Sequence, residues 1–370
     1  MKILVLIERK KLEISDWGGG KGLIWEIKKE LDDNHSIDVM YLEPHQGKIK
    51  RAFYQMGGYV FNKLDFDYDD YDRIIVFPGY LFWIVSKKQW KKTIIVSPDS
   101  LILNASSLYR VTQNWFRKNT IRRLFICISK LHEKALINKC YRYIVVGKND
   151  RRYIRQVLKK RCCEDINKVR FLHHPILSNE QYDINVNELL DCSGEKRFIF
   201  SGDLAKTYQE VTINALVSSL KKREKDLTKE LFIVVLGKNN EWVAKLFRGI
   251  SHVKVKYVRF IEDYYDVCRF GRDVHCIPLA SGSGTKNRTL TAIVNGLEII
   301  STPIGMENIK YNGLTHIYIH RDMGDFAAEM IKVNNHVFEE EDFLDMLTKR
   351  KEFIMMMKSI KKEEINILFN

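Results

Sequence analysis

Residues 274–301, VHCIPLASGSGTKNRTLTAIVNGLEIIS, contain the pattern that decides the fold. A short apolar strand segment (274–278) leads into a Gly- and Ser-rich loop, a helical segment over 286–295 and a second strand segment at 298–301. Strand, loop, helix and strand of these lengths form a βαβ unit, in which the two strands are parallel. The stretch therefore predicts a parallel α/β sheet with the Gly-rich loop at the carboxyl end of a strand.

The same alternation extends through both halves of the chain. In the second half we expect strands at 198–202, 231–237, 252–258, 274–278, 298–301 and 316–319, and helices at 207–222, 241–248, 262–269, 286–295 and 324–333. In the first half we expect strands at 2–7, 37–41, 74–77, 93–97, 143–146 and 169–172, and helices at 21–32, 105–120 and 130–139. Two consecutive doubly wound α/β halves are the simplest account.

The join between the halves is predicted in residues 174–196, which are polar and without strong periodicity. A chain of 370 residues is long enough for two such domains. We predict a first domain over 1–175, a linker over 176–196, a second domain over 197–345 and a C-terminal helix over 346–370 that can pack back on the first domain.

Composition indicates a folded, cytoplasmic protein. The chain is 45% hydrophobic and 29% charged, which is ordinary for soluble domains. Its N-terminal apolar run, Ile3 to Ile7, is too short for a signal peptide, and no run of 18 apolar residues exists to span a bilayer. The seven cysteines are odd in number and include no CxxC pair, so we expect free thiols.

The charge is unevenly distributed. The net charge is +14, and residues 110–160 contain fifteen Lys or Arg against Glu133 and Asp150, a local net charge of +13. A concentrated basic face predicts an anionic partner, which could be phospholipid headgroups, a lipid pyrophosphate or nucleic acid.

Two Gly-rich loops follow strands and open helices. The first, in residues 16–22, contains Gly18, Gly19 and Gly20, which allow the backbone to approach a ligand closely. It matches neither GxGxxG nor GxxxxGK[ST], so alone it could equally be a flexible turn.

The second loop, residues 278–288, is more informative. Gly282 and Gly284 free its backbone, while Lys286 and Arg288 put positive charge in the first turn of the following helix. That charge opposes the helix macrodipole and costs stability unless an anion binds there. The loop also offers the hydroxyls of Ser281, Ser283 and Thr285. The alternative is a capped helix with solvated basic residues.

The run from Pro278 to Ile309 resembles the signature of the retaining GT-B glycosyltransferases related to family four. That signature has a Gly-Ser-Gly-Thr turn, a basic helix, a Glu-Ala pair, a helix-ending Gly, a strand and Thr-x-x-Gly-x-Glu-Gly. The matching residues here are Gly282 to Thr285, Ala292, Gly296, Thr302, Gly305 and Glu307. The resemblance implies two Rossmann-like domains facing across a cleft and a nucleotide-sugar donor.

Fainter similarities extend the resemblance. FSGDLAKTY (200–208) is similar to the strand-turn that begins the family's second domain, and SPDSLILN (97–104) looks like an acceptor-side turn. The implied donor-binding residues are Gly202, Lys206, Gly282, Ser283, Gly284, Thr285, Lys286, Arg288 and Thr291. The implied acceptor-side residues are Gly18, Gly19, Gly20, Asp99 and Ser100.

Asp99, Lys206 and Arg288 are the catalytic candidates. Lys206 and Arg288 would stabilise the charge that develops on the leaving diphosphate, together with the backbone amides of 282–286. Asp99 would orient the acceptor hydroxyl, or it would be a helix N-cap.

The sequence departs from the family at two positions. Thr291 replaces the Glu that usually holds the donor ribose, and Ser283 stands where the first Glu of the paired-glutamate pattern would be. A single hydroxyl accepts less well than a carboxylate, so a non-catalytic member is an alternative to an active enzyme.

We expect no metal and no cofactor beyond the UDP- or GDP-linked donor. Two Asp-x-Asp triplets in the run Asp67 to Asp72 precede a strand of the first half, and a solvated acidic loop is their simplest interpretation.

Three hypotheses of function follow. The preferred one is a retaining glycosyltransferase that acts on a glycan or lipid-linked acceptor in surface polysaccharide biosynthesis, peripherally on the inner face of the cell membrane. The second is a non-catalytic GT-B partner subunit of another transferase. The third, a nucleic-acid binder, has only the pI in its favour, so we expect no nucleic-acid partner.

Residues 105–125 are predicted to lie against an anionic membrane surface. Leu108, Val111 and Trp115 would share one face of a helix, flanked by arginines. The alternative is that these apolar residues pack into the core of the first domain.

Overall fold

The computed structural model describes residues 1–8, 19–42, 66–159, 166–174, 195–202, 204–261 and 264–369, without the side chains of 19–22 and 264–265. It divides into two compact units. The first unit consists of residues 1–176, 283–285 and 357–370, and the second of residues 177–282 and 286–356. The predicted domain boundary at 175 and almost all of the predicted linker lie outside the described residues.

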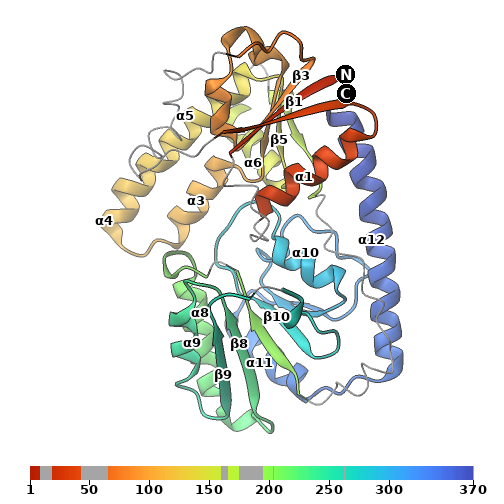
Figure 1. Cartoon of the computed structure of the whole chain (residues 1–370). Coiled ribbons are helices and arrows are strands. Elements are labelled where there is room, and N and C mark those ends of the chain that lie inside the picture. The colour runs from red at the N-terminus through yellow and green to blue at the C-terminus, as the bar shows by residue number, and fades with distance from the viewer. Residues whose placement is uncertain are drawn as a thin grey trace. The chain divides into compact units, whose positions relative to one another are not determined.

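The first unit is built on a six-stranded parallel sheet with the strand order β2-β1-β3-β4-β5-β6 (Figure 1). The strands are β1 (Lys2–Glu8), β2 (Ser36–Leu42), β3 (Arg73–Phe77), β4 (Thr93–Ser97), β5 (Arg142–Val145) and β6 (Val169–Phe171). Alternate residues of β1 enter two different cores, Ile3 and Val5 on one face and Leu4 and Leu6 on the other. Burial on both faces explains why this strand is an uninterrupted apolar run.

Helices connect these strands. They are α1 (Gly19–Asp32), α3 (Leu101–Val111), α4 (Trp115–Arg117), a π-helical turn (Lys118–Arg122), α5 (Arg123–Lys139) and α6 (Lys148–Lys159). Short 3₁₀ helices span Gly79–Ile84, Lys87–Lys92 and Ile166–Lys168. The predicted continuous helix over 105–120 is wrong, because α3 ends at Val111 and Asn114 caps a new helix through its side chain, 2.8 Å from the Arg117 amide.

The second unit repeats the architecture with the strand order β12-β11-β10-β7-β8-β9. The strands are β7 (Arg197–Phe200), β8 (Leu231–Leu236), β9 (Val253–Val258), β10 (Asp273–Ile277), β11 (Glu298–Ser301) and β12 (Ile317–Ile319). The helices are α8 (Lys206–Lys222), α9 (Glu241–Phe247), α10 (Asn287–Val294) and α11 (Met323–Asn335), with 3₁₀ turns at Glu224–Asp226 and Tyr264–Val267. In the described part of the α-helix predicted over 262–269, the chain forms the 3₁₀ turn Tyr264–Val267 instead. All twelve predicted strands are present within two residues of their expected ends.

A long helix, α12 (Glu340–Phe369), ends the described chain and begins before the predicted residue 346. From Met357 onward it belongs to the first unit, where Ile365 and Phe369 are fully buried in the core beside β1. Lys361 also pairs with Glu26 and Glu30 of α1, at 3.1 and 2.8 Å. The end of the C-terminal helix therefore packs on the first unit, as predicted.

None of the helices in the described ranges combines the length and apolar character needed to cross a bilayer.

Candidate functional site

In the second unit, the strand order reverses between β7 and β10, which pair with each other. Ligands of open α/β sheets bind at such a switch point, outside the carboxyl ends of the strands. The residues that follow these two strands are Ser201–Gly202 and the Gly-rich loop from Pro278. The switch point thus falls on the two turns singled out in the sequence.

Arg288 connects the two turns. It lies in the first turn of α10 and its guanidinium donates a hydrogen bond to the carbonyl oxygen of Ser201. Gly202 has a φ of +85°, and a Cβ at this position would lie 2.6 Å from Arg288 Nη2. The positive φ therefore favours glycine at 202, and any larger residue there would also displace the Arg288 guanidinium.

Two lysines differ in their surroundings. Lys286 is at the N-cap position of α10, and its Nζ lies 3.0 Å from where a Cβ on Gly282 would be. Lys206 begins α8, is exposed, and pairs with Glu210 at 3.3 Å. The first turn of α10 contains no acidic residue, so Lys286 and Arg288 oppose the helix macrodipole there, as the sequence suggested.

Buried amides hold these turns in place. Asn240, fully buried, donates to the Gly202 carbonyl at 2.7 Å and accepts from the Leu204 amide at 3.1 Å. Gln209 accepts from the Ala280 amide at 2.8 Å. Sequence analysis missed both residues, because an Asn before a helix reads as an ordinary N-cap and a Gln within α8 as a surface residue.

The rest of the signature packs behind the loop. Thr302 donates to the Leu279 carbonyl at 2.8 Å, and Thr289 donates to the Gly305 carbonyl at 2.8 Å. A Cβ on Gly305 would lie 2.7 Å from Ile277 Cγ2, so this position also requires glycine. Thr291 is half-buried on α10. Its predicted contact with a donor ribose stays a prediction.

The middle of the Gly-rich loop, Ser283–Thr285, belongs to the first unit. There Asp150, fully buried on α6, accepts from the Gly284 amide at 3.0 Å and from the Ser100 amide at 2.9 Å. Thr285 donates its hydroxyl proton to the Val146 carbonyl at 2.7 Å. The Gly284 amide and the Thr285 hydroxyl, both expected to bind the donor, are therefore engaged by protein groups.

Asp99 is not the N-cap of α3. Ser100 occupies that position, and its hydroxyl accepts from the Leu103 amide at 3.2 Å. The Asp99 carboxylate instead lies against Gly284 of the loop. The structure thus brings together Asp99, Ser100 and Gly284, which the sequence assigned to opposite sides of one site.

Glu133 supports this turn from below. Its carboxylate is fully buried and accepts from the Ile102 amide at 3.0 Å and from the Tyr143 hydroxyl at 2.9 Å. It accepts also from the Leu101 amide and the Ser100 hydroxyl. Burial raises the pKa of Glu133 to about 7 despite these four donors. Sequence analysis counted this residue only as one acidic charge.

No protein-family model and no curated protein sequence matches the chain, but solved structures do. Sucrose-phosphate synthase from Thermosynechococcus elongatus is similar with a TM-score of 0.69 and 12% identity, over 99% of this chain and 98% of that one. WaaG, a glycosyltransferase involved in lipopolysaccharide biosynthesis, is similar with a TM-score of 0.62 and 11% identity, over 99% of each chain. Anabaena HepE in complex with UDP and glucose also has a TM-score of 0.62 at 11% identity, over 100% of this chain and 99% of that one. The fold is GT-B.

Two other predicted features of this GT-B chain fall within the first unit. Gly18 is outside the described residues, and Gly19 and Gly20 form the first residues of α1. The acidic run precedes β3, where Asp72 accepts from the Lys2 amide at 2.8 Å. This contact places the run at the amino ends of β1 and β3, and its aspartates are exposed, as expected of a solvated acidic loop.

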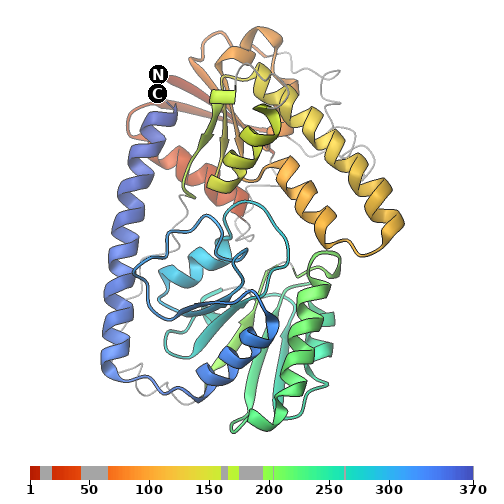
Figure 2. The ribbon, with the colours of Figure 1, turned by 180° about the vertical axis from the view of Figure 1, so that it is seen from behind.

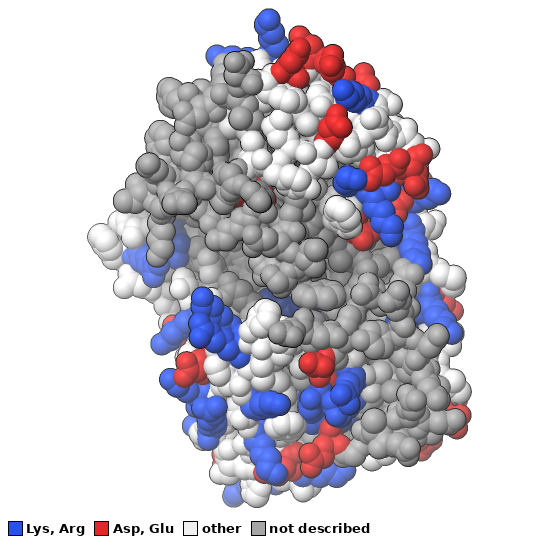
Figure 3. All heavy atoms as spheres, in the orientation of Figure 1, with Lys and Arg blue, Asp and Glu red and all other residues white. Residues whose placement is uncertain are grey.

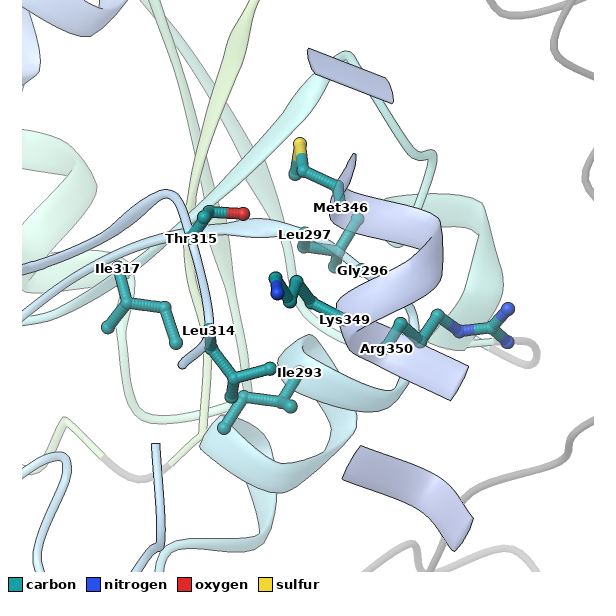
Figure 4. Close-up of a pocket in the computed structure, with 9 residues that line it drawn as sticks. All are labelled: Ile293, Gly296, Leu297, Leu314, Thr315, Ile317, Met346, Lys349 and Arg350. Atoms are coloured by element: carbon teal, nitrogen blue, oxygen red, sulfur yellow. The ribbon is translucent and has the colours of Figure 1, made fainter. Parts of the chain in front are cut away.

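A small pocket lies at the far end of α10 from Lys286 (Figure 4). Its walls include Ile293 of α10, Gly296 just after that helix, and Met346 and Lys349 of α12. At about 20 Å³ it has room for about one water molecule. It is therefore too small for a nucleotide and forms no part of the candidate site.

Proposed function

We propose that this protein is a glycosyltransferase that transfers a sugar from a UDP- or GDP-linked donor to an acceptor. The observation that carries the proposal is Arg288, whose guanidinium lies beside Gly202 where the strand order reverses. HepE, which has the same fold and was solved in complex with UDP and glucose, supports the proposal.

Three cationic side chains would assist departure of the diphosphate. When the bond between the anomeric carbon and the phosphate oxygen breaks, its electron pair passes to that oxygen. Arg288 and Lys286 are held at the loop, and Lys206, which is exposed and pairs with Glu210, would be the third. Because fixed positive charge can stabilise this leaving group directly, we propose a metal-independent reaction.

We propose retention of the anomeric configuration, with Asp99 orienting the acceptor hydroxyl. In this scheme the acceptor oxygen forms the new bond on the face from which the diphosphate leaves, and its proton passes to the departing phosphate oxygen. The position of Asp99 against Gly284 supports such a role. No separate protein base is then needed.

The acceptor proposed is a glycan or a lipid-linked glycan in surface polysaccharide assembly, modified at the cytoplasmic face of the membrane. The basic stretch of residues 110–160, with its local charge of +13, supports an anionic or membrane-bound acceptor.

A non-catalytic GT-B subunit is the second candidate. Thr291 and Ser283 replace the two glutamates of the family pattern, and the Gly284 amide is engaged by Asp150. These features favour a protein that binds a nucleotide sugar without turning it over.

Release of nucleoside diphosphate from a panel of UDP- and GDP-sugars, with and without glycan acceptors and EDTA, tests the proposal. We expect turnover with one donor, unaffected by EDTA, and retained configuration by NMR of the product. Donor binding without turnover for any acceptor would favour the non-catalytic subunit. Neither binding nor turnover would overturn both.

A further inference from the structure

Two buried acids serve one turn of the first unit. In the basic stretch 110–160 the only acidic residues are Glu133 and Asp150. Several bases of this stretch are exposed, and Figure 3 shows blue Lys and Arg atoms beside white ones at the edge where α4 lies in Figure 1. The two acids are instead fully buried, and both accept hydrogen bonds from the Ser100 turn, which we define as residues 97–102. Because a buried carboxylate is costly unless it is hydrogen-bonded, each acid holds this turn in place.

Glu133 fixes the turn at the point where α3 begins. It lies on α5, and in both views α3 and α5 lie side by side (Figures 1 and 2). Its carboxylate accepts from the amides of Leu101 and Ile102, the first two residues of α3, at 3.2 and 3.0 Å. Leu108 of the same helix is buried, so the expectation that it shares an exposed face with Trp115 is wrong. Since negative charge is favourable at the amino end of a helix, Glu133 stabilises the start of α3 in this position.

Asp150 connects this turn to the Gly-rich loop. It lies in the first turn of α6, and its Oδ1 accepts from the Ser100 amide at 2.9 Å. Its Oδ2 accepts from the Gly284 amide at 3.0 Å. The two oxygens of a carboxylate are held rigidly relative to each other, so this bridge keeps the backbones of Ser100 and Gly284 close together.

Two further contacts fix the segments that the bridge joins. The Thr285 hydroxyl donates to the carbonyl oxygen of Val146, which follows β5, at 2.7 Å. The Ser97 hydroxyl donates to the carbonyl oxygen of Asp99 at 2.7 Å. The loop and the Ser100 turn are therefore each held at a second point, with the Asp99 carboxylate against Gly284.

We infer that Asp150 is a positioning residue, which sets the carboxylate of Asp99 at the Gly-rich loop. It acts through the amides of Ser100 and Gly284 and touches no substrate itself. The inference rests on the proposed function, in which Asp99 orients the acceptor hydroxyl. It also assigns the Gly284 amide to this bridge, whereas the family resemblance implied that this amide binds the donor.

In this role Asp150 affects transfer and not donor binding. Arg288 is held by the Ser201 carbonyl oxygen, a contact in which Asp150 takes no part. Without Asp150 the donor should therefore still bind, and water can still attack it. An acceptor hydroxyl needs Asp99 in the correct place, and a displacement of about 1 Å can cost roughly a hundredfold in rate. The ratio of transfer to hydrolysis is therefore the quantity that Asp150 controls.

The variant Asp150→Asn tests the inference. Its amide nitrogen replaces one carboxylate oxygen and cannot accept a hydrogen bond from a backbone amide. With the UDP- or GDP-sugar and the glycan acceptor that wild type uses in the panel above, transfer should fall roughly ten- to a hundredfold. Release of nucleoside diphosphate to water, without acceptor, and the calorimetric affinity for UDP and GDP should stay at wild-type values.

A second variant, Thr285→Val, keeps the test decisive if Asp150→Asn does not fold. It removes the hydroxyl that holds the loop to Val146 and changes the side-chain volume little. The ratio of transfer to hydrolysis should fall in this variant too, again with the affinity for UDP and GDP at the wild-type value.

Asp273→Asn is the matched control, because it also removes a buried carboxylate that holds a backbone amide. Asp273 begins β10 in the second unit, accepts from the Arg269 amide at 2.8 Å and pairs with Arg197 at 2.6 Å. This variant should melt at a lower temperature and keep the wild-type ratio of transfer to hydrolysis.

Two results would overturn the inference alone. One is a parallel fall of transfer, hydrolysis and nucleotide affinity in Asp150→Asn, which would make the residue merely structural. The other is an unchanged ratio of transfer to hydrolysis in whichever of Asp150→Asn and Thr285→Val folds. Absence of nucleotide binding or of turnover in wild type would contradict the proposed function, and the inference with it.

Discussion

The carboxylate of Asp99 lies directly against the Cα of Gly284, which has a φ of +66°. A Cβ on Gly284 would overlap Asp99 Oδ1 and come within 2.9 Å of the Pro98 carbonyl oxygen. Gly284 also donates its amide proton to Asp150. One glycine therefore joins the acceptor-side turn to the Gly-rich loop within the first unit.

Gly284→Ala should abolish this arrangement. The added methyl group meets both a carboxylate and a backbone carbonyl, so the loop must move, and donor turnover should fall at least tenfold. Gly313→Ala is the matched control, because Gly313 has a φ of +88° and nothing within 4 Å of a Cβ. The control carries the backbone strain, about 1–2 kcal/mol, without the clash. Equal kinetics in both variants would show that the Asp99 contact is unimportant.

Thr291→Glu restores the residue that the family has at this position. Thr291 is half-buried on the short helix α10, so a longer side chain can extend from it without entering the core. If the position faces the donor ribose, the affinity for UDP or GDP should change measurably by calorimetry, while the melting temperature stays close to that of wild type. Identical affinities would mean that Thr291 is only a helix residue.

Lys196 and Glu298 form a buried pair in the second unit, with Nζ and Oε2 2.6 Å apart and both side chains less than a tenth exposed. Burial lowers the pKa of Lys196 and raises the pKa of Glu298 to about 6. Lys196→Met leaves a buried, unpaired carboxylate and should cost about 3–5 kcal/mol of unfolding free energy at pH 8. At pH 5 the cost should be smaller, because Glu298 can then take up a proton.

The double variant Lys196→Met/Glu298→Leu completes this experiment. It removes both charges and should recover most of the lost stability in urea unfolding. Additive losses in the two single variants and the double variant would contradict a direct interaction between the two side chains.

The raised pKa of Glu133 predicts that the stability of the first unit depends on pH. Its pKa is about 7 in the folded protein against an ordinary 4.5, so the folded chain holds a proton that the unfolded chain releases. Its contribution to stability is therefore fully present below pH 4.5 and is lost as the pH rises through 7. The loss amounts to about 3 kcal/mol.

Comparison with Glu133→Gln isolates this effect, since other titrating groups are common to both proteins. The stability of wild type relative to Glu133→Gln, from urea unfolding, should fall as the pH rises from 5 to 8. Tryptophan fluorescence suits the measurement, because every tryptophan except Trp242 precedes residue 176. A difference that does not change with pH would mean that Glu133 does not titrate in this range.

The strands could be predicted because their signal is local: apolar, β-branched runs bounded by turn residues. The break between α3 and α4 was missed because the helical period continues through it, although Asn114 is a recognisable cap. Long-range burial could not be predicted. Asp150 and Glu133 are two isolated acids in a basic stretch, and only the folding of α5 and α6 onto the Ser100 turn makes them buried acceptors.

The most direct measurement is a calorimetric titration of wild type, Arg288→Ala and Arg248→Ala with UDP and with GDP. Arg248 is an exposed arginine at the end of α9 and serves as the control. We predict that wild type binds one of the nucleotides, that Arg288→Ala binds it roughly ten- to a thousandfold more weakly, and that Arg248→Ala binds as wild type does. Failure of wild type to bind either nucleotide, or equal affinity in Arg288→Ala, would contradict a nucleotide-sugar site at the switch point.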